Sequence, residues 1–155
     1  GLQECGVSTL LQWPNDLLLG ERKLGGILCQ SRVTGAVARV ACGVGINVRR
    51  SAQDDNASGW AFCEDVARVD RAVLLAAILR AYHVKLAALD EPSRVIREWE
   101  RAAEIPGRRY RVLRDGAREA FDAEAQALED GGALRVVRED ERSETVEMAD
   151  ARVLR

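Results

Sequence analysis

Residues 11–30 read LQWPNDLLLGERKLGGILCQ, two extended apolar segments on either side of a Gly-Glu-Arg turn. Pro14 fixes its own backbone and biases Trp13 toward an extended conformation. Asn15 and Asp16 favour a turn, because their short side chains hydrogen-bond to nearby backbone. The stretch therefore predicts a turn followed by a β-hairpin.

A third strand is predicted at residues 36–48, where GVGINV begins at Gly43. Glycine inside a strand marks a bulge, tight packing or the close approach of a ligand, and the residues alone leave these alternatives open. The Gly-Val-Gly run is not a dinucleotide fingerprint, because no third glycine follows at the required spacing and no helix opens there.

Helical spacing predicts a helix from Arg71 to about Ala88 with Asp70 as its N-cap, and a second helix that Ser93 caps and that runs through Ala102. Residues 51–59 have the composition of a loop. Beyond Ile105-Pro106-Gly107 the pattern changes to short strands with Asp-Gly turns, at residues 109–114, 118–128 and 134–138.

The predicted fold is therefore α+β. It consists of part of a mixed β-sheet with packed helices, followed by a small β-barrel of SH3-like size. We place the domains at residues 1–104 and 105–155.

Composition excludes several classes of function. The 155 residues are 47% hydrophobic and 31% charged with a formal net charge of −2, so a soluble globular chain without nucleic-acid binding is expected. No run of about 18 apolar residues occurs, the longest helical one being Val73–Leu79, and no signal peptide is present, so we expect no membrane span. The chain begins at Gly1 without Met, which indicates a fragment of a longer protein.

Metal or triad chemistry is not indicated. The cysteines Cys5, Cys29, Cys42 and Cys63 lack C-x-x-C spacing, and His83 is the only histidine. Reduced thiols and a cytoplasmic location are the plain interpretation.

Three polar residues stand close to the glycines in sequence. Asn15 and Asp16 alone are typical of a turn, and Lys23 alone is typical of a solvated strand end. Together with glycine-lined strands they suit an anionic, phosphate-bearing ligand, because a lysine stabilises charge on a carboxylate or phosphoryl group.

LQWPNDLLLGERKLGGILCQ, followed by GVGINV, resembles the signature of the biotin protein ligases. The resemblance implies that this chain is the C-terminal part of the catalytic domain followed by an SH3-like domain. It implies ATP-dependent activation of biotin to biotinyl-5'-AMP and transfer to a lysine of a biotin carboxyl carrier protein. It also implies Mg²⁺ as a cofactor, a carrier-protein partner and a possible homodimer.

The resemblance also assigns roles to single residues. Lys23 and Asp16 match the catalytic residues, and Asp16 is also placed near Mg-ATP. Positions that match the nucleotide site are Asn15, Asp16 and Asn47, and positions that match the biotin site are Lys23, Gly26, Leu28, Gly43 and Gly45.

Two departures from the family pattern matter. Gln12 stands where the family usually has a basic residue, and nothing like its glycine/arginine-rich loop occurs in the chain. In the family this loop closes over biotin and the adenylate. Because the chain lacks it, we expect little or no unaided ligase activity. The alternatives are a lipoate ligase-like acyl-adenylate transferase and a non-enzymatic partner-binding relic.

Overall fold

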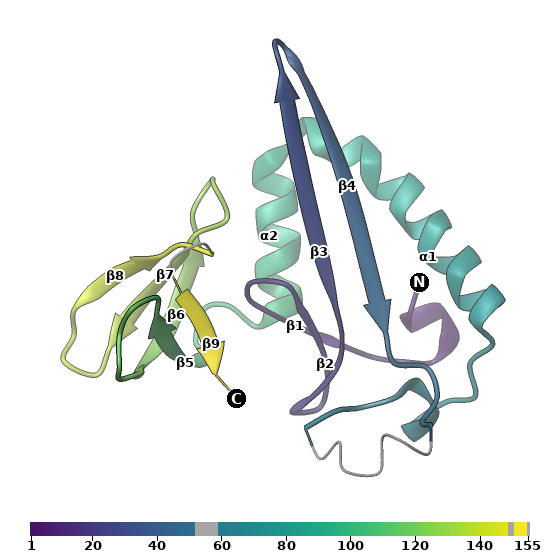
Figure 1. Ribbon diagram of the computed structural model, residues 1–155, viewed down its shortest axis with the longest axis horizontal. Coiled ribbons are helices and arrows are strands. Elements are labelled where there is room, and N and C mark those ends of the chain that lie inside the picture. The colour runs from purple at the N-terminus through teal and green to yellow at the C-terminus, as the bar shows by residue number, and fades with distance from the viewer. Residues whose placement is uncertain (52–58, 149–150, 155) are drawn as a thin grey trace. The chain divides into compact units, whose positions relative to one another are not determined.

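The computed structural model describes residues 1–51, 59–148 and 151–154 (Figure 1). The chain divides into two compact units, Gly1–His83 and Val84–Arg155. The fold is α+β, as predicted, with two sheets and two α-helices. The domain boundary that we place between residues 104 and 105 stays a prediction, and most of the loop expected at 51–59 lies outside the described residues.

The first unit is built on a four-stranded sheet in chain order, and the predicted hairpin and third strand are confirmed in it. Its strands are β1 (Leu10–Gln12), β2 (Asp16–Leu19), β3 (Arg22–Thr34) and β4 (Val37–Ile46). Neighbouring strands pair antiparallel, whereas a mixed sheet was expected. Among the described residues of this unit, parallel pairing occurs as an isolated bridge between Lys23 and Trp60.

The core of the first unit lies at the base of this sheet. Leu17 of β2 and Leu24 of β3 are buried there with Leu74 of the first α-helix. The rest of the buried cluster comes from the segments that flank the sheet, namely Val7, Val48, Ala61, Cys63 and Val69. The far halves of β3 and β4 project from this core as a long exposed hairpin, visible in Figure 1.

The first helix, α1 (Arg71–Leu86), begins where the sequence predicts. Asp70 is its N-cap, because its Oδ1 accepts hydrogen bonds from the backbone N–H groups of Ala72 at 2.8 Å and Val73 at 3.1 Å. The helix continues into a 3₁₀ turn, η3 (Ala87–Asp90). Two further 3₁₀ turns are η1 (Gln3–Cys5) and η2 (Cys63–Asp65).

The stretch Arg71–Asp90, 20 residues long, meets the length and composition of a membrane-spanning helix. The expectation that no such stretch exists is corrected on this point, because the apolar residues extend well beyond Val73–Leu79. One helix of this kind is weak evidence, since the core helix of a soluble protein passes the same test. Leu74 and Ala77 of α1 are buried in the protein.

The second unit contains α2 (Pro92–Ala103) and a five-stranded antiparallel sheet of order β8-β7-β6-β5-β9. Ser93 is not the N-cap of α2: the helix begins at Pro92, with Glu91 in the cap position, because proline is preorganised for the first helical turn. The strands are β5 (Arg109–Arg114), β6 (Phe121–Leu128), β7 (Leu134–Arg138), β8 (Ser143–Val146) and β9 (Ala151–Leu154). The predicted three strands are confirmed, β6 starting later than expected, and β8 and β9 were not foreseen.

Candidate functional site

The centre of the candidate site is an ion pair at the start of the β2–β3 hairpin. Asp16 opens β2 and Lys23 is the second residue of β3. Lys23 Nζ lies 2.5 Å from Asp16 Oδ1, and the two side chains are only 25% and 13% exposed. The hairpin thus places a paired cation and carboxylate at a partly sheltered position of the sheet surface.

Gly26 leaves the space beside this pair open. A Cβ atom at Gly26 would lie 3.3 Å from both the Asn15 carbonyl oxygen and Asp16 Oδ1, and 3.8 Å from Lys23 Cε. The N–H of Ile27 donates to the Asn15 carbonyl at 2.9 Å, which fixes the turn against β3. A side chain at Gly26 would therefore crowd the Lys23–Asp16 pair.

An open depression of about 500 Å³ lies over these residues and over β4. Seven of the eight predicted site residues line it, together with Ile27 and Val44: Asn15, Asp16, Lys23, Gly26, Leu28, Gly43 and Gly45. The structure therefore brings together residues that are up to 30 positions apart. Their individual roles stay predictions.

Gly25, the neighbour of Gly26, is glycine for a different reason. A Cβ atom there would lie 2.1 Å from the carbonyl oxygen of Gly45, which no real contact allows. Of the alternatives that the sequence leaves open, tight backbone packing is therefore correct for Gly25. A register shift between Leu17 and Leu18, opposite this part of β3, adds a bulge at the same place.

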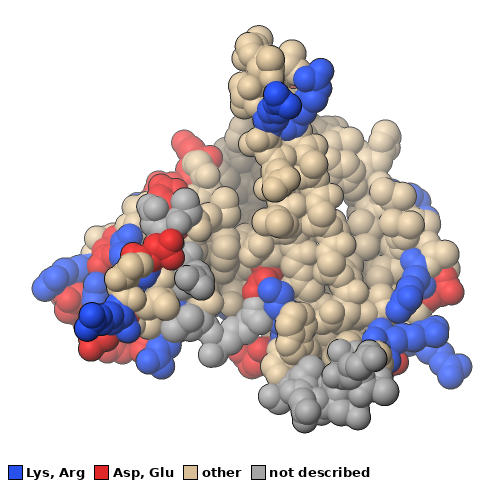
Figure 2. All heavy atoms as spheres, in the orientation of Figure 1, with Lys and Arg blue, Asp and Glu red and all other residues tan. Residues whose placement is uncertain are grey.

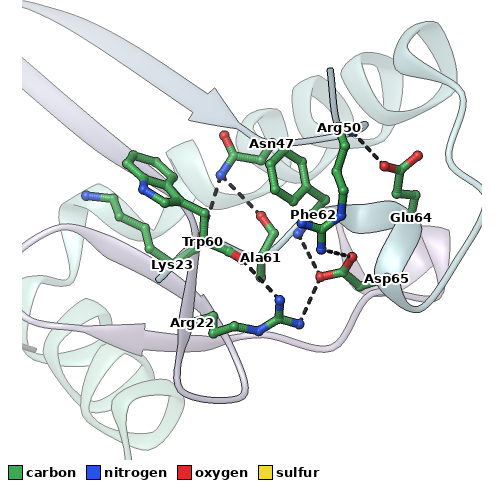
Figure 3. A network of polar contacts seen from close by, with 9 residues as sticks. All are labelled: Arg22, Lys23, Asn47, Arg50, Trp60, Ala61, Phe62, Glu64 and Asp65. Atoms are coloured by element: carbon green, nitrogen blue, oxygen red, sulfur yellow. Dashed lines mark hydrogen bonds and ion pairs between the residues drawn. The ribbon is translucent and has the colours of Figure 1, made fainter. Parts of the chain in front are cut away.

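Asn47, the eighth predicted residue, lies in a neighbouring depression of about 310 Å³ that Trp60 and Phe62 also line. Its side-chain amide donates to the carbonyl oxygens of Lys23 at 3.4 Å and Ala61 at 3.1 Å (Figure 3). The side chain of Asn47 therefore joins two backbone segments, and its nucleotide contact stays a prediction.

The segment that begins at Gly59 is a part of the site that sequence reasoning missed. The N–H of Lys23 donates to the Gly59 carbonyl at 3.0 Å, and the N–H of Ala61 donates to the Lys23 carbonyl at 2.8 Å. Lys23 Nζ lies 6.0 Å from the centre of the Trp60 ring. A tryptophan directly after a polar loop was the available signal, but nothing in the sequence indicates that it pairs with β3.

Asp65 fastens the same segment to the sheet from the other side, between two arginines (Figure 3). Its carboxylate accepts from Arg22 at 2.9 Å and from Arg50 at 2.6 Å. Arg22 also donates to the Trp60 carbonyl, and the Arg50 guanidinium stacks 4.5 Å from the Phe62 ring centre. Burial raises the pKa of Asp65, but the hydrogen bonds from Arg50 and the Phe62 N–H and the charges of both arginines hold that pKa below its ordinary value.

The described part of the chain offers few ligands for a metal at this depression. Among the described residues no group of three or more histidine, cysteine, aspartate or glutamate side chains converges. Of the described residues that line the depression, Asp16 alone carries a carboxylate. A single carboxylate fits Mg²⁺ that takes its other ligands from phosphate oxygens and water.

Comparison with known proteins finds a family match and several relatives. Residues 3–47 match the biotin/lipoate A/B protein ligase family. The bifunctional ligase/repressor BirA of Escherichia coli (strain K12) is 29% identical over 130 residues, which are 80% of this chain and 40% of BirA. BirA of Salmonella typhimurium (strain LT2) gives the same values. The chain thus spans about 40% of the length of these curated relatives.

Solved structures share the fold. The apo biotin protein ligase of Aquifex aeolicus superposes with a TM-score of 0.75 at 19% identity, over 99% of this chain and 68% of that one. The same enzyme in complex with biotin and ATP gives a TM-score of 0.74 at 18% identity, over 99% and 65%. On the motif match, the relatives and the shared fold, this chain is similar to the biotin protein ligases over nearly its whole length.

Proposed function

We propose that this chain contributes the lysine–aspartate side of the active site of a biotin protein ligase. The reaction would activate biotin with ATP to biotinyl-5'-AMP and transfer it to a lysine of a biotin carboxyl carrier protein. The observation that carries the proposal is the Lys23–Asp16 pair, 2.5 Å apart beside the glycine-lined depression.

The chemistry follows from these two side chains. A free carboxylate is a poor acyl donor, so it is first joined to the α-phosphate of ATP as a mixed anhydride. Lys23 would stabilise the negative charge that develops on the carboxylate and the phosphoryl group. Asp16 would orient Lys23, and in the second step it would accept the proton of the incoming carrier lysine. Asp16 would help to hold Mg²⁺, which when bound would supply positive charge beside the phosphates.

The glycine-lined strands would form the biotin and nucleotide floor. Gly26, Leu28, Gly43 and Gly45 would contact biotin, and Asn15, Asp16 and Asn47 would contact the nucleotide. The depression is shallow and open, so we infer that polypeptide outside this chain completes it. The relatives support this, because a third of the Aquifex aeolicus enzyme has no counterpart here.

Calorimetric titration with a non-hydrolysable biotinyl-AMP analogue tests the proposal. Lys23→Ala should weaken binding about tenfold or more, since loss of a partly buried charge contact costs about 2 kcal/mol. Lys85→Ala is the matched control, because Lys85 is the only other lysine of the chain and belongs to the second unit. Equal affinities of the Lys23→Ala and Lys85→Ala variants would contradict the proposal.

The remaining inferences have separate tests. Biotin should displace the analogue and lipoate should not, and the reverse would favour the lipoate ligase-like alternative. Robust biotinylation of a carrier domain by the chain alone would overturn our expectation of little unaided activity. We also infer that the second unit is an SH3-like barrel. We further infer a cytoplasmic location, because all four cysteines are free thiols.

A further inference from the structure

Two cysteines face each other across the long hairpin of the first unit. In the register of β3 and β4, Cys29 is directly opposite Cys42. Both residues are exposed and neither is in a disulfide. The site proposed above uses neither of them, although Cys29 follows Leu28 and Cys42 precedes Gly43.

In the antiparallel β3–β4 ladder, opposite Cα atoms alternate between a wider and a closer spacing, and Cys29 and Cys42 lie at the closer one. The N–H of Asn47 donates to the Leu24 carbonyl at 2.9 Å, which makes 24 and 47 a hydrogen-bonded position of the ladder. The two position types alternate in an antiparallel ladder, so Cys29 and Cys42, five steps further on, occupy a non-hydrogen-bonded position. Opposite Cα atoms at such positions are about 4.5 Å apart, within the range that a disulfide spans.

The two thiols also influence one another's ionisation. Hydrogen bonding with the Cys29 side chain, then burial, then the charge of Cys29 raise the pKa of Cys42. The two other cysteines are not exposed in this way, because Cys63 is fully buried and Cys5 is partly buried against the core cluster of the first unit.

We propose that Cys29 and Cys42 form a redox-active dithiol that exchanges with low-molecular-weight disulfides of the glutathione type. The thiolate of one cysteine attacks a sulfur of the external disulfide, forms a mixed disulfide and releases one thiol. The second cysteine then attacks the protein-bound sulfur, closes the Cys29–Cys42 bond and releases the second thiol. One S–S bond is broken and one is formed, and the two protein thiol protons leave on the two released thiols.

Non-reducing peptide mapping of the full chain tests the proposal. Reduced protein is incubated with oxidised glutathione, quenched in acid and alkylated. The expected product has lost two hydrogen atoms, carries no glutathione and links tryptic peptides 24–32 and 40–49, each with one cysteine. Dithiothreitol should restore both free thiols. Separate glutathione adducts on Cys29 and Cys42 would overturn the proposal.

Two variants and a mixing experiment test whether the disulfide is specific to Cys29 and Cys42 of the same chain. Cys42→Ser should stop the reaction at one glutathione on Cys29, whereas the matched control Cys5→Ser should keep the link. A mixture of isotopically light and heavy protein should give links within one chain, and links between chains would contradict the proposal. In urea the preference for this pair should disappear, and an undiminished yield there would mean that the native register is not its cause.

Discussion

Gly25 has no room for even a methyl group. Because a Cβ atom would lie 2.1 Å from the Gly45 carbonyl oxygen, Gly25→Ala must push β3 and β4 apart. We expect a loss of about 3 kcal/mol or more in the free energy of unfolding, measured by urea denaturation. Gly45→Ala is the matched control: its Cβ would meet nothing closer than the Gly26 carbonyl at 4.0 Å, so its stability should stay near that of the parent. A Gly25→Ala protein of parental stability would refute this account of the packing.

Glycines of the same strand thus have different surroundings, and the sequence alone does not show which surroundings each one has. The motif contains Gly25 and Gly26 side by side and assigns a role only to Gly26. Only the structure shows that Gly25 faces backbone and Gly26 faces the Lys23–Asp16 pair. The same holds for Asn47. The motif predicts that it is a site residue, but not that its side chain hydrogen-bonds to the carbonyls of Lys23 and Ala61. Both depend on contacts with residues distant in sequence.

At the scale of elements, the segment with Trp60 is attached to β3 by Asp65 and its two arginines. The lowered pKa of Asp65 means that its contribution to stability is present above the ordinary aspartate value of 3.8 and is lost as pH falls through the lower folded-state value. Asp65→Asn should therefore cost about 1 kcal/mol at neutral pH, and the difference from the parent should shrink toward about pH 3.

Urea denaturation at the two pH values measures this difference. Asp122→Asn, at an exposed aspartate on β6, is the control and should change stability little at either pH. If the Asp65→Asn deficit were as large in acid as at neutral pH, the ion pairs would not be its source. Chemical shifts of the Trp60 indole N–H should move in Asp65→Asn, because Arg22 joins Asp65 to the Trp60 carbonyl.

Elements with a strong local signal could be predicted, and those that depend on their neighbours could not. The capping aspartate fixes the start of α1, and alternation fixes β5 and β7. In contrast, β8 contains one buried residue, Val146, in an otherwise polar run, so it has no alternating pattern to find. Its strand conformation comes from pairing with β7.

At the scale of the whole molecule, the long hairpin of the first unit has an unusually apolar surface. Figure 2 shows it covered mainly by uncharged residues, with arginine near the tip, where Arg32 and Arg39 pair in register. Five large hydrophobic side chains of β3 and β4 are between 46% and 69% exposed: Leu28, Val33, Val37, Val40 and Val44. Because β4 is also an edge strand of its sheet, this surface can both bury apolar area and extend the ladder.

We therefore predict that the chain self-associates through this hairpin. Sedimentation over a series of protein concentrations should show a rising mass. Val40→Lys should lower that mass, because it replaces an exposed apolar side chain with a charge on the edge strand. Ser143→Lys places the same charge on β8, an edge of the second sheet, and should leave association unchanged. If Ser143→Lys dissociated the protein and Val40→Lys did not, association would occur through β8. The exposed hairpin would then not be the associating surface.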